Sequence, residues 1–212
     1  MKLHTFFRSS AAFRVRIALN LKGLAYESVA VSLPGMEQRR AEFLALNPQG
    51  LVPVLVDDAR VLAQSLAIIE YLDETHPKPP LLPATPEGRA RVRALAQVIA
   101  CDIHPLNNVR VLKYLQGPLG QGDGARQAWY EHWIAEGFQA LEGMLARSAD
   151  TGTFCHGATP TLADVCLVPQ VFNAKRFNCP LAPYPTIVRI FEECMRLEAF
   201  DRAQPSKQPD AA

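Results

Sequence analysis

The sequence predicts an α/β domain followed by an all-helical domain, and three observations support this division. In the first part of the chain, short apolar runs with strand-like alternation are interleaved with amphipathic helical patterns. The segment 77–86 holds five prolines, which favours an extended linker. Beyond it, apolar residues recur at helical spacing almost to the end of the chain. A length of 212 residues suffices for one large domain or two small ones.

The elements of the α/β domain follow from local patterns. The first helix has Phe13, Ile17 and Leu21 on one face. Gly23 stands where its C-cap belongs, and Pro48 ends a later, shorter helix. The expected elements are a strand at 3–7, a helix at 10–22, a strand at 26–33, a helix at 37–46, a hairpin of strands at 54–56 and 60–63, and a helix at 65–75. This βαβαββα order is that of a thioredoxin-like domain.

The second domain is expected to be all-helical. One long helical pattern is interrupted by Pro105, and Thr161 with Asp164 forms a capping box that starts a later helix. The expected helices cover 87–116, 126–147, 161–175 and 185–197, with a glycine-rich turn at 117–124. Residues from Pro205 onward are polar and are expected to be disordered. The expected domains are therefore 1–76 and 87–204, joined by the linker 77–86 and followed by the tail 205–212.

Composition and charge narrow the function classes. The net charge of +1 gives no overall basic field for nucleic acid or a membrane surface. No uncharged run is long enough to span a bilayer, and the N-terminus does not resemble a signal peptide. Five scattered cysteines without a C-x-x-C pair indicate neither a disulfide framework nor a zinc site. The sequence therefore predicts a cytoplasmic protein without a metal centre.

The most informative segment is the start of the first helix, where Ser9 and Ser10 follow an apolar strand. Hydroxyls and free backbone N–H groups meet there at the positive end of the helix dipole. Such a site stabilises an anion, and a thiolate is one candidate. On this pattern alone, an ordinary N-cap is the simpler explanation of Ser9.

Two later segments complete a pattern with the serines. Asn47-Pro48-Gln49-Gly50-Leu51-Val52-Pro53 forms a loop that enters a strand, and Gln64-Ser65 opens a helix with polar residues. Further matching segments are Arg14-Val15-Arg16-Ile17-Ala18-Leu19, Pro105-Leu106-Asn107-Asn108, Val111-Leu112-Lys113, Ala163-Asp164 and the run 168–177. In this combination the whole chain resembles the zeta class of glutathione transferases. Within that class it is most similar to the isomerases that act on maleylpyruvate and maleylacetoacetate.

The resemblance makes Ser9 the hydroxyl that stabilises the glutathione thiolate, with Ser10 as the alternative. One departure from the family bears on the source of the sulfur. The family usually has a cysteine after the two serines and a tryptophan two residues later, whereas this chain has Ala11 and Phe13. Without a protein thiol at the helix start, the sulfur must come from bound glutathione.

The resemblance also implies how the rest of glutathione is held. Val52 and Pro53 resemble the cis-proline loop of thioredoxin-like folds, whose backbone pairs with the cysteinyl part of glutathione like an added strand. Gln64 and Ser65 would hold the γ-glutamyl carboxylate at a helix N-terminus. Gln49, beside the loop, is a further candidate. A proline at a strand start and simple helix capping are the structural explanations of the same residues.

Polar residues of the helical domain could form the wall of a cleft. His104 and Asn108 are four residues apart and would share a helix face, with Arg110 nearby. A solvated helix face explains the same pattern. Arg8, Arg110 and Arg176 come from three separate segments, and most arginines lie at the surface. Together they could bind a dicarboxylate substrate, because a guanidinium binds a carboxylate through two hydrogen bonds.

The expected function is glutathione-dependent cis–trans isomerisation of maleylpyruvate to fumarylpyruvate, or of maleylacetoacetate to fumarylacetoacetate. The resemblance implies that a thiolate adds to the cis double bond, the resulting single bond rotates, and elimination returns the trans alkene and free glutathione. It also implies a homodimer and a site in the cleft between the two domains. A conjugating or dehalogenating transferase and a non-catalytic glutathione-transferase-like binding module are the alternatives.

Overall fold

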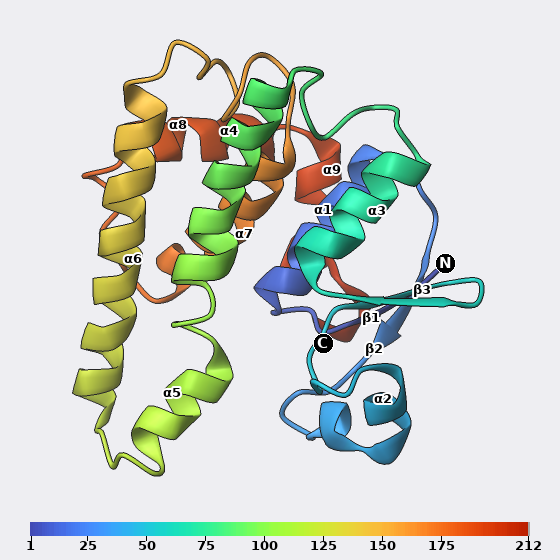
Figure 1. Ribbon diagram of the computed structural model, residues 1–212. Coiled ribbons are helices and arrows are strands. Elements are labelled where there is room, and N and C mark those ends of the chain that lie inside the picture. The colour runs from blue at the N-terminus through green and yellow to red at the C-terminus, as the bar shows by residue number, and fades with distance from the viewer. Residues whose placement is uncertain (212) are drawn as a thin grey trace. The chain divides into compact units, whose positions relative to one another are not determined.

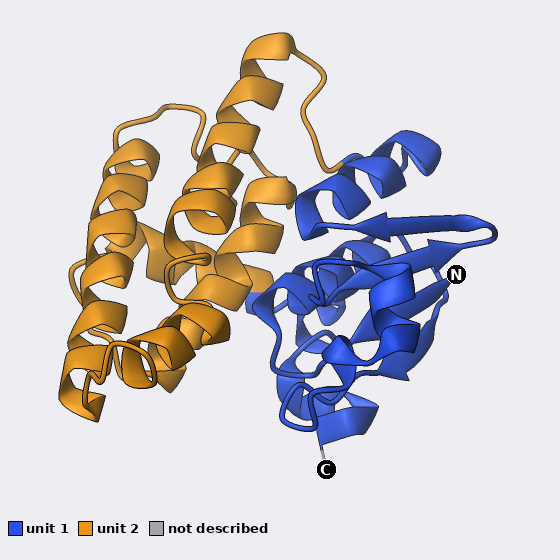
Figure 2. Cartoon of the chain, turned by 60° about the horizontal axis from the view of Figure 1, so that its bottom comes forward, with its two compact units in different colours: residues 1–80, 195–212 blue, residues 81–194 orange. Residues whose placement is uncertain are grey.

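The computed structural model describes residues 1–211, and this part of the chain divides into two compact units. Unit 1 contains residues 1–80 together with the C-terminal segment that begins at Met195, and unit 2 contains residues 81–194 (Figure 2). Unit 1 holds a sheet with helices and unit 2 is helical, which confirms the predicted fold class.

Unit 1 is built on a mixed sheet with the strand order β2-β1-β3-β4. The strands are β1 (Lys2–Thr5), β2 (Glu27–Ala30), β3 (Val54–Asp57) and β4 (Arg60–Ala63). Leu3 of β1 lies opposite Ser28 in the parallel pair with β2 and opposite Leu55 in the antiparallel pair with β3. A parallel pair needs a crossover connection, which α1 (Ser10–Leu21) provides, whereas β3 and β4 form the predicted hairpin.

Helices cover both faces of this sheet. α1 packs against α3 (Ser65–Thr75) on one face, and α2 (Ala41–Leu46) lies on the other (Figure 1). Neighbouring residues of a strand point to opposite faces, so Val54 and Leu55 of β3 serve different cores. Val54 clusters with Phe43 of α2, and Leu55 is fully buried.

Comparing predicted and observed bounds in unit 1 shows which elements can be predicted from local sequence patterns. α3 has the predicted bounds 65–75, whereas β1 ends at Thr5 because the chain turns from Phe6 to Ser9. The predicted helix at 37–46 is divided into the short 3₁₀ helix η1 (Glu37–Arg39) and α2. The division falls at Arg40, which has the extended angles φ −70° and ψ 151°.

Unit 2 is a set of packed helices. They are α4 (Pro86–Gln97), the π-helical segment η2 (Val98–Ile103), α5 (Val109–Gln116), α6 (Asp123–Ala146), α7 (Leu162–Arg176) and α8 (Pro185–Met195), the last of which ends in unit 1. The predicted helix at 87–116 is therefore π-helical from Val98 to Ile103 and is interrupted at residues 104–108, around Pro105 as predicted. Ile103, the last residue of the π-helical segment, packs against Gly137 of α6, where an added Cβ would collide with the Ile103 side chain. This close approach needs glycine.

The predicted capping box at the start of α7 is confirmed. The carboxylate of Asp164 is fully buried, and its Oδ2 accepts a hydrogen bond from the Thr161 N–H at 2.8 Å. Its Oδ1 accepts from the Cys155 N–H at 2.8 Å. Burial raises the pKa of Asp164, and these hydrogen bonds oppose that shift.

The expectation of a disordered tail is wrong for residues 205–211, which form the 3₁₀ turns η3 (Pro205–Lys207) and η4 (Pro209–Ala211). The expected helical domain 87–204 also ends too late, because the chain returns to unit 1 at Met195 and forms α9 (Glu198–Asp201) there. Polar side chains of α1 explain this return, since the buried Arg16 and the partly buried Asn20 donate to backbone carbonyls of the C-terminal segment. Position 212 lies outside the described residues.

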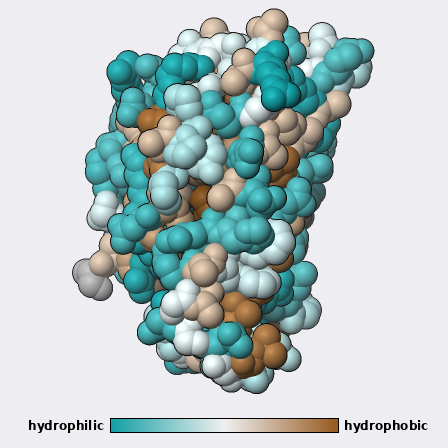
Figure 3. Space-filling model, turned by 90° about the vertical axis from the view of Figure 1, so that its left-hand side faces the viewer, coloured by the Kyte–Doolittle hydropathy of each residue, from teal (hydrophilic) through white to brown (hydrophobic). Residues whose placement is uncertain are grey.

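Among residues 1–211, no helix is long and apolar enough to cross a membrane. One face of the molecule mixes hydrophilic and hydrophobic side chains, with the latter in small groups (Figure 3). No group of three or more His, Cys, Asp or Glu side chains in the described residues could hold a metal ion.

Candidate active site

The turn from Phe6 to Ser9 joins β1 to α1 and places Ser9 at the N-terminus of the helix. The Ser9 N–H donates to the Phe6 carbonyl at 2.9 Å, which closes the turn. The Ser9 backbone is extended, with φ −70° and ψ 118°, and its Oγ accepts a hydrogen bond from the Ala12 N–H at 3.2 Å. Ser9 is therefore the N-cap of α1.

Capping leaves the Ser9 hydroxyl able to donate a hydrogen bond. A serine hydroxyl has one O–H donor and two acceptor lone pairs, and the contact with Ala12 uses one acceptor. Ser9 is half-buried, whereas Ser10 is buried as the first residue of α1. The N-cap is therefore compatible with the second interpretation, because the side chain that caps the helix still has a hydroxyl hydrogen to donate. Its greater exposure favours Ser9 over Ser10 for that role.

The loop 47–53 is held in shape by its own groups. Asn47 Nδ2 donates to the Leu51 carbonyl at 2.8 Å, and Asn47 Oδ1 accepts from the Gln49 N–H at 3.1 Å. Gly50 has φ +62°, and a Cβ there would lie 2.9 Å from the Gln38 carbonyl oxygen. The glycine therefore permits both the turn and the approach of the neighbouring segment.

Val52 and Pro53 connect this loop to β3. Their peptide bond is cis, as predicted. No hydrogen bond within residues 1–211 uses the backbone N–H or carbonyl of Val52. The Val52 side chain belongs to the cluster with Phe43 against which Phe6 packs, so Val52 lies near the turn that carries Ser9. Its backbone groups can pair with an extended peptide as an added strand would.

The start of α3 holds the last of the predicted glutathione-binding residues in unit 1. Gln64 is the N-cap residue, with φ 71°, and its Nε2 donates to Gln49 Oε1 at 2.9 Å. Ser65 is buried, and its Oγ accepts from Arg14 Nη1 at 3.3 Å. Arg14 is 2% exposed on α1 and is absent from the residues predicted from the sequence. Its guanidinium adds a positive charge beside the N-terminus of α3, where an anion is already favoured.

These contacts bring together the predicted glutathione-binding residues of unit 1. Gln49 meets Gln64 directly, α1 and α3 meet through the hydrogen bond to Ser65, and the turn meets the loop through the packed side chain of Val52. Arg8 lies in the same turn and is exposed. Its guanidinium carbon lies 5.7 Å and 5.0 Å from the centres of the Phe6 and Phe7 rings, which hold it by stacking.

The predicted residues of the helical domain lie around the break between η2 and α5. His104 is the half-buried C-cap of η2, and Asn108 is the N-cap of α5, where its Oδ1 accepts from the Arg110 N–H at 3.1 Å. The expectation that His104 and Asn108 share a helix face is wrong, because residues 104–108 are not helical. Arg110 is exposed in the first turn of α5.

Tyr130 connects this break to the end of α7. Its carbonyl accepts from Asn107 Nδ2 at 3.2 Å, and its ring stacks on Phe177 with 3.8 Å between ring centres. Arg176, the last residue of α7, is exposed with its guanidinium carbon 4.8 Å from the centre of the Phe177 ring. Burial raises the pKa of Tyr130, and the positive charge of Arg176 opposes this shift. Unit 2 therefore places Arg176 in the neighbourhood of the break beside Asn108.

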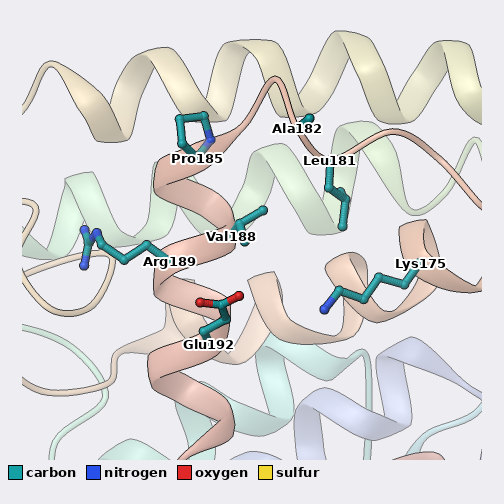
Figure 4. A pocket seen from close by; sticks show the side chains of 7 residues that line it. All are labelled: Lys175, Leu181, Ala182, Pro185, Val188, Arg189 and Glu192. Carbon is teal, nitrogen blue, oxygen red and sulfur yellow. The ribbon is translucent and has the colours of Figure 1, made fainter.

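A pocket of about 540 Å³ lies elsewhere in unit 2, between the end of α7 and α8 (Figure 4). It is lined by Lys175, Leu181, Ala182, Pro185, Val188, Arg189 and Glu192, none of which is a predicted site residue. Lys175 and Glu192 point toward one another, while Arg189 extends to the other side of α8 and donates to the carbonyls of Gly152 and Thr153. The pocket is distinct from the group around Asn108 and Arg176.

Comparison with known proteins identifies the family. The N-terminal domain of glutathione S-transferases matches residues 3–80, and the C-terminal domain matches residues 127–192. The chain therefore belongs to the glutathione S-transferase family, in its zeta class.

Relatives with known names are similar over the full chain. A probable maleylacetoacetate isomerase of Vibrio cholerae is 54% identical over 211 residues, covering 99% of this chain and 97% of that protein. A structure of a maleylpyruvate isomerase, described as a bacterial zeta-class glutathione S-transferase, is 52% identical with a TM-score of 0.98 and full coverage of both chains. A maleylacetoacetate isomerase of Methylobacterium extorquens, solved with malonate and glutathione bound, is 46% identical with a TM-score of 0.97 and full coverage of both chains.

Proposed function

We propose that this chain is a glutathione-dependent cis–trans isomerase that converts maleylpyruvate to fumarylpyruvate or maleylacetoacetate to fumarylacetoacetate. The observation that carries the proposal is the end-to-end similarity, at about half of all positions, to isomerases with these substrates. A shared fold alone would not fix the reaction, because one fold hosts many activities. Here the residues of the site support it as well.

The donors and acceptors in unit 1 fit glutathione. The tripeptide offers a thiol, two amide links and two carboxylates. Val52 has a backbone N–H and carbonyl that no group within residues 1–211 uses, and these match the amide groups of an extended peptide. Gln64 and Ser65 stand at a helix N-terminus with Arg14 beside it, which suits a carboxylate. The Ser9 hydroxyl has a donor to spare for the sulfur.

When bound, glutathione supplies the thiolate that adds reversibly to the cis double bond and so permits rotation about it. The task of Ser9 is to donate a hydrogen bond to that sulfur and to favour its ionised form. The N-terminus of α1 acts in the same sense through its partial positive charge. No cysteine stands at the helix start, where Ala11 follows the serines, so no protein thiol competes for the substrate there.

The substrate needs positive charge, because both candidate substrates carry two carboxylates. We assign Arg8, Arg110 and Arg176 to bind them, since all three are exposed and at least two rest against aromatic rings that keep them in place. The relative solved with malonate and glutathione bound supports a dicarboxylate ligand. We also assign His104 and Asn108 to bind glutathione, as the resemblance to the family implies. We further propose that the protein is a cytoplasmic homodimer.

The test is turnover of both substrates, side by side, with substrate in large excess over glutathione. The reaction should run to completion with the concentration of free thiol unchanged, and the product should have the trans coupling constant by NMR. S-methylglutathione, which has no thiol, serves as the matched control and should support no turnover. The ratio of the two kcat/KM values identifies the preferred substrate.

Two other outcomes separate the competing functions. A reaction that stops after one equivalent of glutathione, with an equal loss of free thiol, identifies a conjugating transferase. Retention on immobilised glutathione without turnover of either substrate identifies a binding module. Either result refutes the proposed isomerase.

A further inference from the structure

The C-terminal segment reaches the turn that carries Ser9, and it does so at Phe7. The Phe7 N–H donates to Asp210 Oδ2 at 2.9 Å. The Phe7 carbonyl accepts from Arg16 Nη2 at 3.0 Å. Both backbone polar groups of one residue in the turn are therefore held by charged side chains, one from α1 and one from the end of the chain.

Arg16 links the turn to the C-terminal segment a second time. Its side chain has no exposure, and its Nε donates to the Ala203 carbonyl at 3.1 Å. Its Nη1 donates to Thr5 Oγ1 at 3.1 Å. Burial lowers the pKa of Arg16 to about 10, and nearby Asp210 opposes that shift, so the guanidinium stays charged at neutral pH. A single buried cation thus holds β1, the turn and the C-terminal segment together.

The geometry of the turn explains why Phe7 matters for Ser9. The turn is closed by the Ser9 N–H and the Phe6 carbonyl, so Phe7 and Arg8 are its two central residues. The peptide group between the central residues rotates when a turn changes between type I and type II. The carbonyl of that peptide group belongs to Phe7 and is the one that Arg16 holds. Arg8 has no positive φ, which type II would require.

We propose that Asp210 and Arg16 are positioning residues for Ser9, acting through the backbone of Phe7. The inference rests on the proposed function, in which the Ser9 hydroxyl donates to the glutathione thiolate. Asp210 holds the N–H of Phe7 and Arg16 holds its carbonyl, so the direction in which the chain enters α1 is fixed before any ligand binds. A hydroxyl displaced by about 1 Å would lose much of its effect on the thiolate.

Asp210 is the residue on which to test this proposal. Its other oxygen, Oδ1, is buried without a hydrogen-bond partner among the described residues, so the bond to Phe7 is the only hydrogen bond of this carboxylate there, and its removal also takes away a negative charge near Arg16. Asp210→Ala removes the acceptor, and Asp210→Asn keeps an oxygen in the same place. Asp201→Ala is the matched control, because Asp201 belongs to the same segment but accepts from Gln204 and Lys207 within it.

Five measurements are needed on each variant. Amide hydrogen exchange at Ser9 in the ligand-free chain reports whether the turn stays closed. Thiolate absorbance of bound glutathione against pH reports the environment that the Ser9 hydroxyl provides. Isomerase turnover, glutathione affinity and the unfolding temperature complete the set, and the unfolding temperature separates positioning from general stability.

For Asp210→Ala we expect faster exchange at Ser9, a rise of roughly 0.5–1 in the pH of half-ionisation, and a roughly tenfold lower kcat. Glutathione affinity should change by less than about twofold, since the loop 47–53 and α3 still hold the tripeptide. Asp210→Asn should restore both the ionisation curve and kcat to within about twofold of the wild-type values. Asp201→Ala should match the wild-type protein in these two readouts, whatever its unfolding temperature.

The proposal is overturned if Asp210→Ala keeps wild-type exchange at Ser9 and a wild-type ionisation curve. It is also overturned if Asp201→Ala reproduces the losses of Asp210→Ala, because the segment would then act only through stability. A wild-type chain that isomerises neither substrate refutes the proposed function, while exchange at Ser9 still decides whether Asp210 holds the turn.

Discussion

Replacing Ser9 by alanine removes two hydrogen bonds of different kinds, and the structure allows their effects to be separated. The first is the cap of α1, in which Ser9 Oγ accepts from the Ala12 N–H at 3.2 Å. The second is the proposed bond from the hydroxyl to the glutathione thiolate. The cap is present without ligand and contributes to stability, whereas the bond to sulfur forms only in the loaded enzyme.

The expected magnitudes follow from these contacts. Loss of an N-cap side chain costs about 1 kcal/mol of the free energy of unfolding. For a chain of this length that corresponds to a fall in the unfolding temperature of roughly 2–4 °C. Loss of a donor to a developing or stabilised anion typically costs a factor of roughly 10²–10³ in kcat. The pH of half-maximal activity should rise in Ser9→Ala, because the thiol then ionises less readily.

Thr85→Ala provides the matched control for the cap. Thr85 is the N-cap of α4, and its Oγ1 accepts from the Gly88 N–H at 3.1 Å, so it loses the same kind of bond away from the candidate site. The assay compares unfolding temperature, glutathione affinity, and the pH profile of isomerisation in the two variants. The reasoning is refuted if Ser9→Ala loses no more activity than Thr85→Ala and keeps the wild-type pH profile. Ser10→Ala would then be the next variant to measure.

Two further predictions concern charge and thiols. Replacing Arg8, Arg110 or Arg176 by methionine should raise KM for the dicarboxylate about tenfold or more for at least two of the three, since a hydrogen bond to a charged group contributes about 1.5–3 kcal/mol. The control is Arg202→Met, which removes an exposed arginine that pairs with Glu198 of α9. Equal kinetics in all four variants would show that other residues bind the anion. Iodoacetamide should modify the exposed Cys101 alone and leave activity with fresh glutathione intact, because the other four cysteines are buried. Mass spectrometry counts the modified thiols, and inactivation that a glutathione analogue prevents would contradict the expectation.

Much of the fold could be predicted from local patterns in the sequence. The bounds of α3 and the capping box at Thr161 were predictable because both depend on residues within one or two helical turns. The interruption of the helix at 87–116 was predictable from Pro105, which lies in the non-helical residues 104–108, but the π-helical segment from Val98 to Ile103 was not. Its close packing on Gly137 joins positions distant in sequence, and no local pattern shows that contact.

The candidate site also contains residues that local patterns predict and residues that they do not. Ser9 stood out because a serine before an amphipathic helix is a local pattern. Arg14 and Arg16 were present in a matching segment, yet nothing nearby in sequence shows their partners. Arg14 meets Ser65, and Arg16 meets Ala203, which is separated from it by 187 positions. Two arginines fully buried in an otherwise apolar helix are in hindsight the signal for such partners, because a buried charge must be paired or hydrogen-bonded.

The return of the chain to unit 1 has a consequence for how the protein is made. Residues 1–80 leave the ribosome first, and residues 81–194 must follow before the segment from Met195 can join them. At a synthesis rate of roughly 5–20 residues per second, this interval lasts on the order of ten seconds. During that time the guanidinium of Arg16 lacks the carbonyl of Ala203 and the N–H of Phe7 lacks the carboxylate of Asp210. The N-terminal unit therefore reaches its final hydrogen bonding only after the segment that holds Ala203 and Asp210 has been synthesised.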